Sequence, residues 1–87
     1  MDTEDVARQV SEFLTEELGV PEHEISPVAD LRADLGLDSL DLVELITVME
    51  DRIGTRLDQD ELKVIRTVND VAEVLVRILQ DPSRAVV

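Results

Sequence analysis

The chain has 87 residues and a formal charge of −13 at pH 7, from 21 acidic residues against eight lysines and arginines. A domain of this size buries only about 60–65% of its unfolded surface on folding, so a full core leaves no room for a buried substrate cavity of enzyme size. The charge argues against binding to nucleic acid, which needs a cationic surface, and favours partners that present arginine and lysine. Acidity that serves solubility alone explains the charge equally well.

The apolar composition predicts an aliphatic core. Hydrophobic residues make up 44% of the chain, yet Phe13 is the only aromatic residue, so valine, leucine and isoleucine must fill the core. No run of 18 apolar residues and no basic-then-apolar leader occurs, and we therefore expect no membrane insertion, no export and a cytoplasmic protein. The chain has no cysteine, so the protein itself supplies no disulfide or thiolate.

The first predicted helix begins at Thr3, which can cap it, and ends near Gly19. The residues on its apolar face are Val6, Val10, Phe13 and Leu14. Their spacing of three and four residues places them on one side of the helix, so this side should face the core.

A long loop over residues 19–37 follows the first helix. It holds two of the three glycines and two of the three prolines. We expect a helical turn around residues 28–33 within it. Three apolar side chains should attach the loop to the core, namely Val28, Leu31 and Leu35.

The second predicted helix runs from Ser39 to Ile53, stops at Gly54 and has two apolar faces. The broad face, which should enter the core, consists of Leu42, Leu45, Ile46, Met49 and Ile53. Roughly opposite lie Leu40, Val43 and Thr47, with the acids Glu44, Glu50 and Asp51 around them. A small apolar patch inside an acidic rim is typical of a transient docking surface for a basic partner, although single exposed apolar side chains are also common.

Residues 55–66 predict a short helical segment, from which Leu57, Leu62 and Ile65 should reach the core. Thr67 should then cap a last helix that ends at Pro82. The apolar stripe of this last helix consists of Val68, Val71, Ala72, Leu75, Ile78 and Leu79.

The fold class that these elements predict is all-α, because no strand alternation or internal repeat occurs. We expect a small bundle of three main helices plus one short helix, with a long loop between the first and second helices. Residues 1–81 should form one domain, and residues 82–87 a flexible C-terminal tail.

The start of the second helix, in the run DLGLDSLDLVEL, leaves three roles to consider for Ser39. A hydrolase nucleophile is disfavoured, because the preceding strand and the glycines of G-x-S-x-G are missing and His23 is the only histidine. As a structural cap, Ser39 or Asp38 would accept amide hydrogen bonds, with Asp41 completing a capping box. If Asp38 is the cap, the neighbouring hydroxyl is free for covalent modification. The residues alone do not decide between a cap and a modification site.

A calcium-sensing protein is also disfavoured. Counted from Asp34, position 6 of an EF-hand loop is Ser39, where glycine is needed, and position 12 is a leucine, where a bidentate glutamate is needed. We expect no dedicated metal site, and at most loose divalent binding at Asp38, Asp41 and Glu44.

The run DLGLDSLDLVEL strongly resembles the phosphopantetheine attachment motif of acyl carrier proteins, in which Asp-Ser-Leu opens a helix and Val-Glu-Leu follows. The resemblance covers nearly the whole chain, because EELGV, DLRADLG and TVNDVAEVL also lie where such proteins have them. Asp-Ser-Leu by itself is a weak signal, but these segments in this order are a strong one. The arginine in DLRADLG departs from the commonest bacterial carriers.

The resemblance implies that Ser39 bears 4'-phosphopantetheine through a phosphodiester, added from coenzyme A by a magnesium-dependent phosphopantetheinyl transferase. Asp38 would help this transferase to position its metal and the serine. A thiol on the arm, in place of a cysteine, would carry growing acyl chains as thioesters. The protein would then be a carrier and not an enzyme.

The resemblance also implies the partners, and together with the two faces of the second helix it indicates the docking residues. The partners would be acyl synthases, reductases and acyltransferases of fatty-acid or polyketide biosynthesis, with basic docking surfaces, and the carrier itself a monomer. The docking residues would be Leu40, Asp41, Val43, Glu44, Thr47, Glu50 and Asp51.

Two alternatives stay open at this stage. Peptidyl and aminoacyl carriers commonly show a Gly-Gly-x-Ser version of the motif, and LDSLD argues against that class. An unmodified acidic helical interaction protein remains only if Ser39 is inert.

Overall fold

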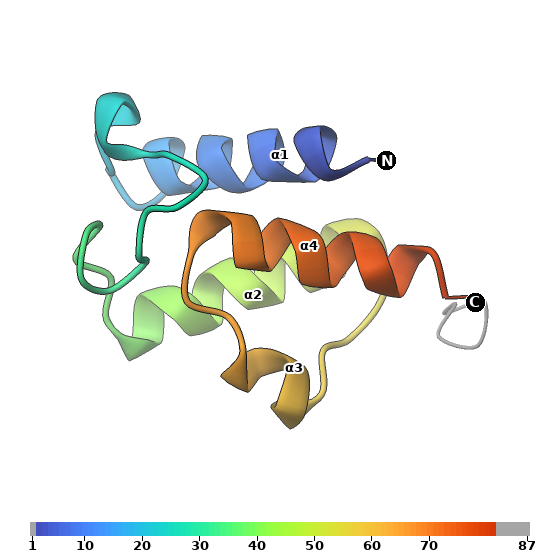
Figure 1. Ribbon diagram of the computed structural model, residues 1–87. Helices are drawn as coiled ribbons and strands as arrows, with labels where there is room; N and C mark the ends of the chain where they lie inside the picture. Colours follow the sequence, from blue (N-terminus) through green and yellow to red (C-terminus); the bar gives the residue numbers. More distant parts are fainter. Residues whose placement is uncertain (1, 82–87) are drawn as a thin grey trace.

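The computed structural model describes residues 2–81, and within that range it consists of helices joined by turns and loops, which confirms the predicted all-α class. Its elements in chain order are α1 (Thr3–Glu16), the 3₁₀ turn η1 (Glu22–Glu24), α2 (Ser39–Ile53), α3 (Gln59–Lys63) and α4 (Val68–Leu79). Helices α1 and α4 lie side by side, and the short α3 is set apart on the connection between α2 and α4 (Figure 1). The predicted flexible tail over residues 82–87 lies outside the described residues.

The first helix differs from its prediction at both ends. Asp2, not Thr3, is the cap: its carboxylate accepts the Asp5 N–H at 2.9 Å, and Thr3 is already helical. Aspartate and threonine can both accept hydrogen bonds from the free amides of a first helical turn, and here Asp2, one residue before Thr3, is the one that does so. At the other end the helix stops at Glu16, and the Val20 N–H donates to the Leu14 carbonyl at 3.0 Å, which folds the buried Val20 back onto the core.

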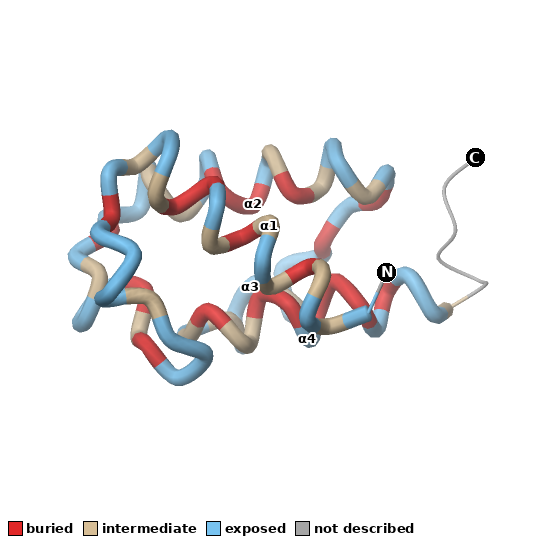
Figure 2. The backbone as a smooth tube through the Cα atoms, turned by 90° about the horizontal axis from the view of Figure 1, so that it is seen from above, coloured by how far each residue is buried: buried red, intermediate tan, exposed pale blue. Residues whose placement is uncertain are grey.

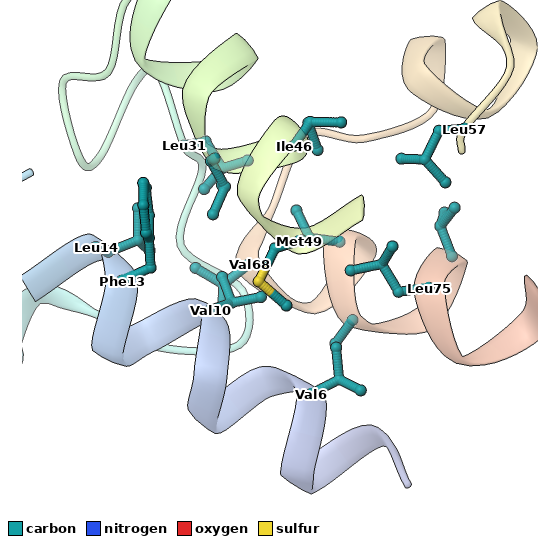
Figure 3. Packing of buried hydrophobic residues seen from close by; sticks show 14 of the residues in the cluster. Val6, Val10, Phe13, Leu14, Leu31, Ile46, Met49, Leu57, Val68 and Leu75 are labelled. Atoms are coloured by element: carbon teal, nitrogen blue, oxygen red, sulfur yellow. The ribbon is translucent and has the colours of Figure 1, made fainter. Parts of the chain in front are cut away.

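The core is one cluster, aliphatic apart from Phe13, built mainly from α1 and α4 and closed by α2 (Figures 2 and 3). The buried residues of the first and last helices are Val6, Val10, Phe13 and Leu14 from α1 and Val68, Val71, Ala72, Val74, Leu75, Val76 and Ile78 from α4. The predicted face of α1 is confirmed, whereas α4 is buried around more of its circumference than a single stripe. Leu79, predicted to be buried, is 41% exposed because it lies in the last turn, beyond most of the packing.

The loop before α2 is tied to the start of α4 by backbone hydrogen bonds. The Asn69 and Val68 N–H groups donate to the carbonyls of Pro27 and Ala29 at 2.9 and 3.2 Å. Because the backbone on both sides of Val28 is turned toward α4, the Val28 side chain is left 80% exposed, and its predicted contact with the core is wrong.

Other apolar residues of this loop hold it against the core. Leu31 is buried as predicted, while Val20, Ala29 and Leu37 are buried without having been predicted. Leu35 is half-buried and packs against the same cluster. The predicted helical turn occurs a little later than residues 28–33, over residues 31–35.

The bounds of α2 agree with the prediction at both ends. Asp38 caps the helix, and Gly54 ends it with a φ of +82°, a left-handed conformation that glycine adopts without steric cost. Thr67 caps α4 as predicted, in a capping box with Asp70. Between these helices, α3 buries none of its five residues, and Leu62, predicted to reach the core, is 41% exposed.

Candidate functional site

The site begins at the first turn of α2, where the capping and modification roles of Ser39 can be separated. The Asp38 carboxylate accepts the Asp41 N–H at 2.8 Å, and the Asp41 carboxylate accepts the Asp38 N–H at 3.2 Å. These reciprocal bonds form the predicted capping box without any contribution from the serine hydroxyl. Ser39 is exposed in the first helical position, so its Oγ is accessible from solvent.

A contact with the preceding loop fixes the position of this hydroxyl. Nη2 of Arg32 donates to Oγ of Ser39 at 2.9 Å, across seven residues of sequence. The sequence did not predict this bond, because nothing local to a helix start indicates which loop residue turns back toward it. The only signal was the arginine in DLRADLG, which had no assigned role.

The turn that carries Arg32 is held by its own carboxylates. Oδ1 of Asp30 accepts the N–H groups of Ala33 and Arg32 at 2.8 and 2.9 Å, and Asp34 accepts the Asp30 N–H at 2.7 Å. The hydrogen bonds from Ala33 and then Arg32 stabilise the ionised carboxylate and hold the pKa of Asp30 below its ordinary value. Gly36 closes the turn with a φ of +71°.

A hollow of about 360 Å³ extends from this point between α2 and α3. Ser39 and Arg32 lie where α2 begins, and Glu50 lies toward the other end of the helix. The walls are mostly apolar and include Leu42, Val43, Ile46, Leu62 and Ile65. We call this hollow the α2–α3 groove. It explains the exposure of Leu62, whose side chain lines the groove instead of entering the core.

The second face of α2 is divided between the groove and open solvent. Val43 and Thr47 are exposed as expected, but both line the α2–α3 groove. Leu40 is 75% exposed and does not line it. The predicted apolar patch therefore consists of one projecting leucine beside the edge of a groove.

The acidic residues of α2 also divide into two groups. Glu44 and Asp51 are exposed, and Asp41 is half-exposed within the capping box. Glu50 is different, because its side chain is only 11% exposed: Oε2 accepts the Leu57 N–H at 2.8 Å, and Oε1 lies 3.8 Å from Nη1 of Arg56. Its carboxylate thus holds the connection between α2 and α3, a role that the sequence pattern did not indicate.

Neither a metal centre nor a membrane span is found in the part of the chain that the structure describes. Among residues 2–81, no group of three or more His, Cys, Asp and Glu side chains is placed to hold a metal ion. Loose divalent binding at Asp38, Asp41 and Glu44 stays a prediction. Over the same range, every helix is too short or too polar to cross a lipid bilayer.

Comparison with known proteins identifies what such a site does. A family model described as a phosphopantetheine attachment site matches residues 8–75. Similar curated proteins are acyl carrier proteins from three bacteria. They come from Saccharopolyspora erythraea (46% identical over 74 residues, 85% of this chain and 78% of the relative), Rubrobacter xylanophilus (40% over 76 residues, 87% and 94%) and Nitratidesulfovibrio vulgaris (42% over 65 residues, 75% and 86%).

The small helical fold and this match define a domain that carries phosphopantetheine. The chain belongs to the acyl carrier protein family. It is accordingly a carrier and not a catalyst, and its cofactor is phosphopantetheine, as the sequence predicted. The site fits this group, because an exposed serine hydroxyl, contacted by a guanidinium, stands at the end of a groove with apolar walls.

Proposed function

We propose that Ser39 is the residue that carries 4'-phosphopantetheine, and that the protein delivers acyl thioesters to enzymes of fatty-acid or polyketide biosynthesis. The observation that carries this proposal is the separation of roles at the start of α2. Asp38 and Asp41 satisfy the helix terminus between them, and Ser39 is left with an exposed hydroxyl at the end of the α2–α3 groove.

The residues around Ser39 have distinct parts in this function. The bound arm supplies a thiol, which the chain itself lacks. Asp38 keeps the helix start ordered, so that Oγ is presented in one orientation to the phosphopantetheinyl transferase. We also assign to Asp38 the role of helping the transferase to position its metal.

The α2–α3 groove is suited to the acyl chain. Its walls are aliphatic, and it begins beside the attachment residue, so an acyl chain could return along α2 and leave water. The wall opposite α2 includes Leu62 of α3 and Ile65 just after it, neither of which is fully buried in the absence of an acyl chain.

The exposed surface of α2 supports docking of partner enzymes. Leu40 projects from the first turn as an apolar contact, and Glu44 and Asp51 give the surface a negative charge. Such a surface would attract synthases, reductases and acyltransferases with basic docking sites over about a Debye length. The capping-box residue Asp41 and the groove residues Val43 and Thr47 complete the proposed docking surface, whereas the buried carboxylate of Glu50 is less available to a partner.

The test is transfer of the arm to apo protein from coenzyme A by a phosphopantetheinyl transferase, followed by mass spectrometry of the intact chain. Ser39→Ala should abolish the mass increment and leave the helical circular dichroism nearly unchanged, because Asp38 still caps α2. Ser26→Ala, at an exposed loop serine, should load like the wild type. Loading of the Ser39→Ala protein would disprove the assignment.

A further inference from the structure

We propose that Arg32 is a cofactor-binding residue of this carrier, and that its guanidinium pairs with the phosphodiester and fixes the root of the arm at the mouth of the α2–α3 groove. This inference rests on the proposed attachment at Ser39. It goes beyond that attachment, because it assigns a specific contact to a loop residue outside the attachment motif.

The geometry places the guanidinium where the new charge would arise. Nη2 of Arg32 already lies 2.9 Å from Oγ of Ser39, the atom that would be bonded to phosphorus. The anionic oxygens of a phosphodiester are two bonds from that atom. Arginine suits them well, since its planar donors pair with phosphate oxygens through charge-assisted hydrogen bonds.

The surrounding charges favour a basic partner for the phosphodiester. The carboxylates of Asp38 and Asp41 stand beside Ser39, and their capping box occupies two backbone N–H groups of the helix terminus. Those two amides are therefore not free to bind an anion, and the carboxylates oppose one. Arg32 is the one basic residue among the described residues that line the α2–α3 groove.

The loop holds Arg32 in place before any cofactor is attached. Leu31 is buried, and its N–H donates to the Arg66 carbonyl at 2.8 Å. The Asp30 carboxylate accepts the Arg32 N–H itself, and the Arg32 carbonyl accepts the Gly36 N–H at 3.0 Å. A residue whose backbone is held in this way loses little backbone freedom when it pairs with the phosphodiester, so more of the interaction energy is retained.

Arg66 provides a matched control within the same region. Both arginines line a smaller hollow beside the groove, but Arg66 pairs with Asp30 at 3.9 Å and does not line the groove that contains Ser39. Removal of either arginine changes the net charge equally. Only removal of Arg32 should change the interaction with the arm.

The experiment compares apo and loaded forms of the wild type, Arg32→Gln and Arg66→Gln, after mass spectrometry has verified loading of each. Two quantities are measured: the change in melting temperature on loading, and the ³¹P chemical shift of the phosphodiester. We expect loading to raise the melting temperature of the wild type and of Arg66→Gln by about 2–4 °C more than that of Arg32→Gln, the size of a single exposed ion pair in a small domain. This difference should shrink at high salt, and the ³¹P signal should shift only in Arg32→Gln.

Equal changes in melting temperature and the same ³¹P shift in the wild type and Arg32→Gln would overturn the inference. A merely structural role of Arg32 would lower the apo and loaded melting temperatures together and leave the phosphorus signal in place. Arg32→Lys keeps the charge without the planar donors and should give an intermediate result, and it replaces Arg32→Gln in the comparison if that variant does not fold or load. Absence of the arm from Ser39 in the wild type would instead contradict the proposed function.

Discussion

The two sides of this small domain are built differently. On one side, α1 and α4 pack against each other, and α4 is buried around much of its circumference. On the other side, α2 faces α3 across a hollow, and α3 buries none of its residues. We refer to these as the packed side and the groove side.

The same kinds of aliphatic residue therefore serve two purposes: on the packed side they stabilise the fold, and on the groove side they form the walls of the α2–α3 groove. The packed side removes valine and leucine from water and supplies most of the folding free energy. The groove side leaves Val43 and Leu62 partly in water, which is unfavourable until an apolar chain covers them. Ser39, the proposed attachment residue, and Arg32 lie on the groove side, so a modification there would leave the packed side unchanged.

The most direct comparison replaces one leucine on each side by alanine. Leu75→Ala should lower the free energy of unfolding by about 2–5 kcal/mol, because it opens a cavity among fully buried residues. Leu62→Ala should lower it by less than about 1 kcal/mol, since its side chain is already partly solvated. Urea denaturation of both variants measures the difference. Equal losses would mean that the groove side is as tightly packed as the other.

Substitutions of Glu50 measure how much a polar contact contributes to the stability of the groove side. Glu50→Ala leaves the Leu57 N–H without its acceptor and should cost about 1–3 kcal/mol in denaturant unfolding. Glu50→Gln retains an oxygen acceptor and should recover much of this loss. The neighbouring exposed Asp51→Ala should change stability by no more than about 0.5 kcal/mol. A loss for Asp51→Ala as large as that for Glu50→Ala would show that charge, and not the hydrogen bond, matters at this position.

Asp70 lies in the first turn of α4, on the packed side, and bonds to Arg66 and Thr67 of the segment before it. The pH dependence of stability can be tested there. Burial raises the pKa of Asp70, but hydrogen bonds from Thr67 and Arg66 outweigh it, and the pKa in the folded state lies below its ordinary 3.8. The stabilisation is therefore complete above about pH 3.8 and is lost as the pH falls through the lower folded pKa. Asp70→Asn should cost about 1 kcal/mol at neutral pH, the size of a helix cap, and the gap to the wild type should close in acid. Parallel stability curves down to strongly acidic pH would contradict this.

The smallest expected change in stability is at the proposed docking surface. Glu44→Lys should alter the free energy of unfolding by less than about 0.5 kcal/mol, because the side chain is exposed. It should nevertheless slow acyl transfer to a basic partner enzyme, and more strongly at low salt than at high salt. The measurement is the rate of acyl transfer across a salt series. Glu16→Lys on α1, which makes the same change of charge away from α2, is the control. Identical rates for Glu44→Lys and the wild type at every salt concentration would exclude this helix as an electrostatic docking surface.

Local signals in the sequence were sufficient for the bounds of α2 and for the start of α4, whereas the choice of Ser39 as the residue that we propose to be modified rested on the resemblance to acyl carrier proteins. Asp38, Gly54 and Thr67 act within a few residues of the helix ends that they define, so the sequence alone predicted α2 and the start of α4. The exception is the cap of α1, where two adjacent residues could serve and Asp2 is the one that does.

Contacts between distant segments could not be predicted in the same way. The bond from Arg32 to Ser39 and that from Leu57 to Glu50 each span seven residues that include a loop, and their formation depends on how the loop folds. Likewise Val28 and Leu62 have the apolar character of core residues, but backbone pairing with α4 leaves the first in solvent and the groove leaves the second half-open. Hydrophobicity predicts that a residue prefers burial, and the topology decides whether burial is available.

The shortness of α3 affects how the groove opens. A helix of five residues is not stable by itself in water, and this one depends on the capping box of Asp58 and Glu61 and on its connections to α2 and α4. Its backbone amides should exchange with solvent deuterium well before those of α4, through local opening that leaves the rest of the domain folded. One wall of the groove can then move outward at little cost in free energy. The volume of about 360 Å³ is therefore the resting size of the groove and sets no limit on the length of the acyl chain that we propose it would accept.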